Sequence, residues 1–201
     1  MTRIVVLISG RGSNMKAVVN ACDTGQINAE VVAVISNRPN AAGLDYAKSQ
    51  GISTSVCDHT QYSSRDQFDA ELATMIDSAK PDWIVLAGFM RILGAELVQR
   101  FVGRMINIHP SLLPKYPGLN THERAITAGD LVHGASVHFV IPELDAGPVI
   151  EQISIPIQKA DTADSLAARV LAEEHDLLIK ALARCANGEV QLTSNGISIS
   201  P

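Results

Sequence analysis

Two polar side chains, Asn107 and His109, close an apolar run in the middle of the chain. Residues 105–108 predict a β-strand, and Pro110 forces the chain to leave it. Because side chains alternate along a strand, Asn107 and His109 are expected on the same face. An amide can stabilise an oxyanion and an imidazole can move a proton, so the pair suggests acyl-group chemistry. The structural alternative is a loop-capping asparagine beside a buried, hydrogen-bonded histidine.

A carboxylate that could serve His109 lies at Asp145, in a loop bounded by Pro142 and Pro148. Most aspartates in such loops form turns. However, a histidine that acts as a general acid benefits from a carboxylate that orients its ring and favours its protonated form. We therefore predict that Asp145 assists His109.

A glycine-rich loop near the N-terminus is the second candidate site. Residues 3–8 predict a buried parallel strand, residues 15–22 predict a helix, and Ser9-Gly10-Arg11-Gly12-Ser13-Asn14 joins them. Converging backbone N–H groups at a helix N-terminus can bind a phosphate. A tight turn that needs glycine for its dihedral angles explains the loop equally well.

The residues after this loop restrict the type of phosphate ligand. The nucleotide P-loop motif is absent, and a dinucleotide motif would need a small residue at Met15. It would also need an acid after the second strand, which instead ends in residues 36–38, Ser-Asn-Arg. The loop therefore favours a monophosphate.

Three further segments have unusual polarity. Residues 88–93 are apolar where a strand should open to solvent, which suits a flat pterin or a buried turn. Glu174 falls on the apolar face of the last helix, so a structural donor or a ligand's hydroxyl groups must satisfy it. Arg65 lies in a helix's first turn, where it is either simply solvated, the interpretation we favour, or binds an anion.

The order of the predicted elements indicates an α/β fold. Strands and helices alternate from residue 3, which predicts one Rossmann-like domain with a mostly parallel seven-stranded sheet flanked by helices. Besides residues 3–8 and 105–108, strands are expected at residues 29–35, 52–57, 83–87, 132–141 and 149–157. The last helix starts from Asp161 or Thr162, the third from Ser63 or Ser64, and residues 190–200 form a tail that could add an edge strand.

Composition narrows the class of protein. A net charge of −5 and a pI near 5.6 argue against a large nucleic-acid footprint. Three distant cysteines without a C-x-x-C pair disfavour disulfides and zinc, and the spacing of four histidines (109, 122, 133 and 138) fits no metal motif. The first apolar run is too short for a membrane span or signal peptide, so we expect a cytoplasmic protein.

Residues 107–114, Asn-Ile-His-Pro-Ser-Leu-Leu-Pro, resemble the signature of the folate-dependent formyltransferase superfamily. Members move or hydrolyse the formyl group of 10-formyltetrahydrofolate. Residues 9–14, 90–93, 136–140 and 144–148 extend the resemblance from residue 3 to about residue 188. The pattern is similar to members that formylate the amine of N1-(5-phospho-D-ribosyl)glycinamide in purine synthesis.

The resemblance implies roles for individual residues. Asn107, His109 and Asp145 would be catalytic. The backbone of Gly12, Ser13 and Asn14 would bind the acceptor's phosphate, and Glu174 its ribose hydroxyls. Leu171 would contact the acceptor where some relatives carry glutamine. The folate site would comprise Arg65, Met90, Arg91, Ile92, Leu93, Asn107, Ile141, Pro142, Glu143, Leu144 and Asp145.

The resemblance also predicts which molecules the chain binds and how its functions divide along the sequence. The formylfolate is a cosubstrate, no metal is expected, and a homodimer is possible. Within a single domain spanning 1–201, residues 1–100 would bind phosphate, 101–188 would carry catalysis and folate binding, and 189–201 would form a tail. The alternatives are formyltetrahydrofolate hydrolase, another folate-dependent formyltransferase such as the methionyl-tRNA enzyme, or a non-enzymatic phosphometabolite-binding domain. We expect no room for the regulatory or nucleic-acid-binding domain that the first and second of these would add.

Overall fold

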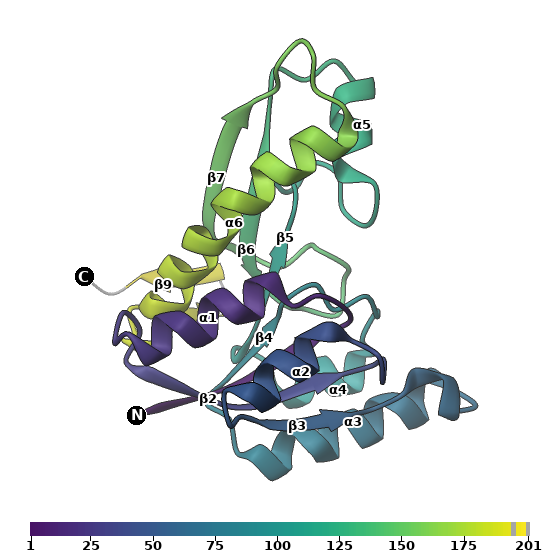
Figure 1. Ribbon diagram of the computed structural model, residues 1–201, viewed down its shortest axis with the longest axis vertical. Helices are drawn as coiled ribbons and strands as arrows, with labels where there is room; N and C mark the ends of the chain where they lie inside the picture. The colour runs from purple at the N-terminus through teal and green to yellow at the C-terminus, as the bar shows by residue number, and fades with distance from the viewer. Residues whose placement is uncertain (194–195, 200–201) are drawn as a thin grey trace.

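The computed structural model describes residues 1–193 and 196–199, and its centre is a seven-stranded sheet (Figure 1). The strand order is β3-β2-β1-β4-β5-β6-β7. The first five strands in this order pair in parallel, whereas β6 and β7 are antiparallel. The strands are β1 (Thr2–Ile8), β2 (Ala29–Ser36), β3 (Ser53–Val56), β4 (Trp83–Leu86), β5 (Met105–His109), β6 (Val132–Phe139) and β7 (Val149–Pro156).

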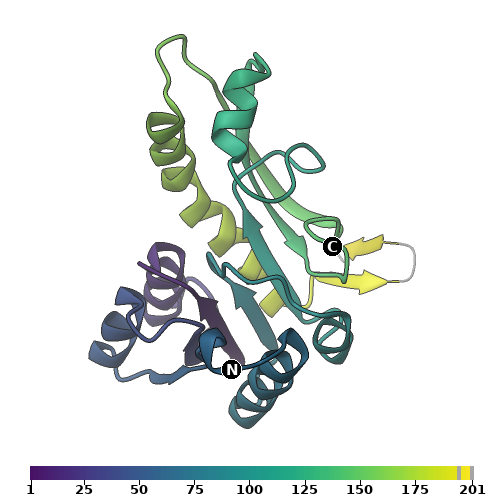
Figure 2. The same ribbon diagram turned by 90° about the vertical axis from the view of Figure 1, so that its right-hand side faces the viewer.

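Helices cover both faces of this sheet, which explains why β1 is apolar without alternation. Ile4, Val6 and Ile8 pack against α1, α2 and α6, whereas Val5 and Leu7 pack against α3 and α4. Figures 1 and 2 show these two helical layers on opposite sides. The helices are α1 (Ser13–Asp23), α2 (Ala42–Ser49), the 3-10 helix η1 (His59–Gln61), α3 (Arg65–Ala79), α4 (Ala95–Arg100), α5 (Thr121–Thr127) and α6 (Ala163–Ala186).

Most of the predicted elements are present, and the predicted α/β fold with a mostly parallel sheet is confirmed. Of the alternative caps, Ser64 accepts from the N–H of Gln67 and begins α3, while Thr162 accepts from the N–H of Ser165 and begins α6. Helix α4 is not among the predicted elements. It is 6 residues long and therefore carries little periodic signal.

The predicted edge strand after α6 is wrong for the described residues. β8 (Val190–Thr193) and β9 (Gly196–Ile199) pair with each other in a separate antiparallel sheet, seen in yellow in Figure 2. Val190 is buried within the same apolar cluster as Cys185. The hairpin therefore attaches to the domain by apolar packing and not by strand pairing with the main sheet. Residues 194, 195, 200 and 201 lie outside the described part.

Two general properties follow from the described residues. No helix among them combines the length and the apolar character needed to cross a membrane. Cys22, Cys57 and Cys185 are free thiols, and burial raises the pKa of Cys185 to about 12.

The capping box of α6 provides a test of the fold. Thr162→Ala removes the hydroxyl that accepts from the N–H of Ser165, so we expect a loss of about 1 kcal/mol in the free energy of unfolding. Urea denaturation measures this loss. Thr74→Ala, whose hydroxyl bonds only a carbonyl within α3, is the control and should change stability by less. Equal effects of the two substitutions would contradict the capping role.

Candidate active site

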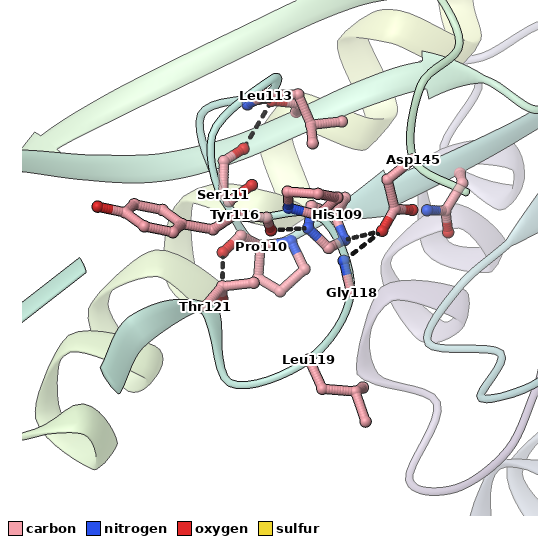
Figure 3. A network of polar contacts seen from close by, with 12 residues as sticks. His109, Pro110, Ser111, Leu113, Tyr116, Gly118, Leu119, Thr121 and Asp145 are labelled. Atoms are coloured by element: carbon pink, nitrogen blue, oxygen red, sulfur yellow. Dashed lines mark hydrogen bonds and ion pairs between the residues drawn. The ribbon is translucent and has the colours of Figure 1, made fainter. Parts of the chain in front are cut away.

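His109 and Asp145 lie together where β5 ends (Figure 3). The His109 residue is 6% exposed, and its Nδ1 lies 3.5 Å from Oδ2 of Asp145. Its Nε2 lies 2.9 Å from the carbonyl oxygen of Tyr116 and donates a hydrogen bond to it. The Nδ1 distance is too long for a good hydrogen bond, so a water molecule or a reacting group could interact with both Nδ1 and the carboxylate.

Backbone geometry brings Asp145 to this position. The loop after β6 turns back closely, and an added side chain at Gly147 would lie 1.7 Å from the carbonyl oxygen of Phe139. Asp145 itself has a left-handed backbone with φ of 51°. Its Oδ2 accepts a 2.8 Å hydrogen bond from the N–H of Gly118, as Figure 3 shows. The carboxylate is therefore held by the loop that follows β5.

That loop is rigidly supported by hydroxyl groups. Thr121 donates to the carbonyl of Pro110 at 2.6 Å, Ser111 to that of Lys115 at 2.6 Å, and Ser136 to that of Ser111 at 2.6 Å. The carbonyl of Tyr116 thus faces His109 from a fixed position. Prolines keep the chain out of regular structure, and these hydroxyl groups satisfy its backbone.

Asn107 lies beside a second histidine, His138, which is directly opposite it in the β5–β6 register. His138 Nδ1 is 2.8 Å from the carbonyl oxygen of Phe139, and its Nε2 is 3.1 Å from Nδ2 of Asn107. Burial lowers the pKa of His138, so the ring is neutral near pH 7. Assigned from this network, Nδ1 carries the proton and Nε2 accepts from Asn107, which leaves the second amide N–H available for an oxyanion.

The sequence identifies His138 only as one of four histidines whose spacing fits no metal motif. The structure places its Nε2 3.7 Å from Oδ1 of Asp145 as well, so this carboxylate lies between two histidines. Alternation along β5 and β6 predicts on which face Asn107 and His138 each lie. Only the register between the two strands shows that they are neighbours.

Two cavities flank the end of β5. The glycine-loop cavity, of about 420 Å³, is lined by residues 9–14 and also by Ile108 and Pro110. The Asp145-loop cavity is lined by residues 141–145 and by Asn107 and His138. Because successive side chains of β5 point to opposite faces, the strand separates the two cavities and contributes to both.

Except for His109 and Arg65, which line neither cavity, the predicted site residues divide between the two cavities. The glycine-loop cavity receives Gly12, Ser13, Asn14, Met90, Leu171 and Glu174. The Asp145-loop cavity receives Arg91, Ile92, Leu93, Asn107, Ile141, Pro142, Glu143, Leu144 and Asp145. Met90 therefore lies apart from its three neighbours. Arg65 lines neither cavity and lies beside Gly94 and the buried Asp69.

Glu174 has both a structural donor and room for a ligand. Its Oε2 accepts a 2.8 Å hydrogen bond from Nδ2 of Asn14, and burial raises the pKa of its carboxyl group. Oδ1 of Asn14 is buried and has no hydrogen-bond partner in the described structure. A ligand hydroxyl could satisfy such an atom.

Sequence reasoning missed two arginines in the glycine-loop cavity. Arg11 and Arg38 both line it, and neither side chain makes a hydrogen bond or ion pair among the described residues. The positions of Arg11 between two glycines and of Arg38 at the end of β2 were visible signals. Two unpaired cations at one cavity suit an anionic ligand.

The described residues contain no cluster of three or more histidines, cysteines or acids that could bind a metal. His122 and His133 are instead close to each other, with 3.1 Å between Nδ1 of His122 and Nε2 of His133. Their partly or fully buried rings pack edge to face. The pair supports the loop after β5, because His133 also bonds the backbone at Pro110.

Comparison with known proteins gives the family to which this chain belongs. The Formyl transferase family matches residues 2–182. Phosphoribosylglycinamide formyltransferase of Escherichia coli K12 is 48% identical over 96% of this chain and 91% of its own length. The human trifunctional purine biosynthetic protein adenosine-3 is 43% identical over 96% of this chain, which spans 19% of that longer protein. The solved phosphoribosylglycinamide formyltransferase of Coxiella burnetii superposes with a TM-score of 0.94, at 47% identity over 98% of this chain and 93% of that one.

The chain therefore belongs to the formyl transferase family, and the resemblance predicted from residues 107–114 is confirmed. Within that family, its similarity over nearly its full length is to the phosphoribosylglycinamide formyltransferases.

The histidine pair predicts a pH dependence of stability. Burial and then His133 lower the pKa of His122 from 6.5 to about 4, and burial lowers that of His133. In the unfolded chain both histidines bind a proton near pH 6.5, whereas in the folded protein they do so only at lower pH. The free energy of unfolding is therefore unaffected by them above pH 6.5 and falls as the pH drops towards 4. Urea denaturation between pH 7.5 and 4.5 should show this fall. We expect a shallower fall in His122→Gln, whereas equal slopes would contradict the assignment.

Proposed function

We propose that the chain transfers the formyl group of 10-formyltetrahydrofolate to the amine of phosphoribosylglycinamide, a step of de novo purine biosynthesis. The observation that carries this proposal is the end of β5, where Asn107 and Asp145 line one cavity, Ile108 and Pro110 line the other, and His109 lies 3.5 Å from Asp145. A transferase needs two bound substrates that meet at one reacting carbon. The choice of acceptor is supported by phosphoribosylglycinamide formyltransferases that match this chain over more than nine tenths of their own length.

The glycine-loop cavity suits the acceptor. The backbone N–H groups of Gly12, Ser13 and Asn14 begin α1 and would bind the phosphate, with Arg11 and Arg38 adding charge from the solvent side. Glu174 would accept hydrogen bonds from the ribose hydroxyls, and Leu171 offers only apolar contact. The Asp145-loop cavity would bind the folate ring, and Arg65, which lines neither cavity, would contact the folate's glutamate.

The catalytic residues then divide the chemistry of direct transfer. The neutral amine attacks the formyl carbon, and the carbonyl oxygen becomes an oxyanion that the free N–H of Asn107 and protonated His109 stabilise. Asp145 stabilises the imidazolium and takes up, through water, the proton that the attacking amine releases. His109 donates its proton to N10 as the C–N10 bond breaks and the carbonyl of the transferred formyl group re-forms. Such proton transfer and one oxyanion donor each contribute roughly 10²–10³-fold or more.

Hydrolysis of the formylfolate is the second candidate, since water could replace the amine. The glycine-loop cavity, which Glu174 also lines, is large enough for an acceptor much bigger than water. An absorbance assay of folate deformylation with and without phosphoribosylglycinamide separates the two. We expect turnover only with the acceptor, whereas equal rates without it would refute transfer. A homodimer, a cytoplasmic location, the absence of nucleic-acid partners and the two functional halves remain predictions.

The proton-transfer role of His109 is tested by His109→Ala. We expect kcat to fall about a hundredfold or more, because the variant retains both cavities but loses the group that moves the proton. The dissociation constants of both substrates, measured by calorimetry, should stay within a few-fold and serve as the internal control. Wild-type turnover in this variant would remove His109 from the chemistry.

The phosphate assignment is tested by Gly12→Val. Gly12 has φ of 70°, and an added Cβ would lie 3.0 Å from Cε of Met15. We expect KM for phosphoribosylglycinamide to rise about tenfold and KM for the formylfolate to stay nearly constant. Gly129→Val is the matched control, since Gly129 has φ of 71° but lines neither cavity. Weakened folate binding with normal acceptor binding would contradict the assignment.

A further inference from the structure

A buried hydroxyl connects the strand ends around the glycine-loop cavity. Ser9 follows β1, is 5% exposed, and accepts a 2.7 Å hydrogen bond from the backbone N–H of Met90. The same hydroxyl donates to Oδ1 of Asn37, which follows β2, at 2.5 Å. One hydroxyl thus joins the ends of β1 and β2 to the segment after β4.

The direction of these bonds is determined. The Met90 N–H can only donate, so Ser9 Oγ accepts from it and gives its own proton to Asn37. Asn37 is 1% exposed, and Nδ1 of His59 lies 2.8 Å from its backbone carbonyl oxygen and 3.2 Å from its Nδ2. The shorter distance assigns Nδ1 as a donor to the carbonyl, so η1 holds the backbone of Asn37.

Met90 lies in the segment that forms a wall of both cavities. Ala87, Gly88 and Met90 line the glycine-loop cavity, whereas Phe89, Arg91, Ile92 and Leu93 line the Asp145-loop cavity. The only bond that a side chain makes to the described backbone of residues 87–93 is the one from Ser9. A shift of this segment would move the walls of both cavities together.

We infer that Ser9 is a positioning residue that sets the separation of the two substrates by fixing the backbone at Met90. This inference rests on the proposed two-substrate transfer. Because misplacing reacting groups by about 1 Å can cost roughly a hundredfold in rate, a loosened wall should act mainly on kcat. Asn37 supports Ser9 by keeping its hydroxyl oriented towards Met90.

The test replaces the hydroxyl and measures its effect on catalysis. In Ser9→Ala we expect kcat to fall about tenfold or more, with a few-fold rise in KM for both substrates. Asn37→Ala should give the same pattern with a smaller loss, and Ser9→Thr, which keeps the hydroxyl, should recover part of the rate. A folded Ser9→Ala protein with wild-type kcat would overturn the inference.

Thr24→Ala is the control. Thr24 follows α1, lines neither cavity, and its hydroxyl donates only to the carbonyls of Asn20 and Ala21 among the described residues. This variant should leave kcat and both KM values unchanged. The same loss of kcat in this control would reduce Ser9 to a general structural role and overturn the inference.

Amide hydrogen exchange provides a readout that is independent of activity. The Met90 N–H should exchange about tenfold faster in Ser9→Ala, because it loses its acceptor. Failure of the proposed function would appear separately, as a wild-type protein without acceptor-dependent turnover. The exchange rate would then decide the role of Ser9 alone, and an unchanged rate would overturn it.

Discussion

The antiparallel pairing of β6 with β5 is the constraint on which the site depends. Parallel strands place their carboxyl ends at one edge of a sheet, and β5 presents Asn107 and His109 there. The reversed direction of β6 places His138 opposite Asn107 and lets the chain re-enter the site at Asp145. The strand reversal therefore converts a general ligand-binding edge into a local cluster of amide, imidazole and carboxylate groups.

The cluster is polar but almost fully enclosed, so each group needs a defined partner. The neutral state of His138 and its bond to Phe139 orient Asn107, while backbone groups of the following loop hold His109 and Asp145. Asp145 lies beyond good hydrogen-bond distance from both histidines, 3.5 Å from His109 and 3.7 Å from His138. His109 and Asp145 can therefore interact with a substrate without first breaking a strong bond between them.

The division into two cavities follows from alternation along two adjacent strands. Leu86 and Asn107 face the Asp145-loop cavity, whereas Ala87 and Ile108 face the glycine-loop cavity. A transferase can thus place its two substrates on opposite sides of one sheet end and let them meet beyond it. The polar bonds through Ser9 and Asn37 hold the strand ends in this arrangement.

Local patterns in the sequence determined the alternating elements, the shared face of Asn107 and His109, and the need of Glu174 for a partner, because these depend on neighbours within one strand or helix. The unbroken string at residues 107–114 also determined the family. Only the tertiary structure decided the pairing of Asn107 with His138, the two arginines at one cavity, the side on which Met90 lies, and the separate hairpin after α6. Each of these depends on register or burial between segments far apart in the chain, which no local pattern records.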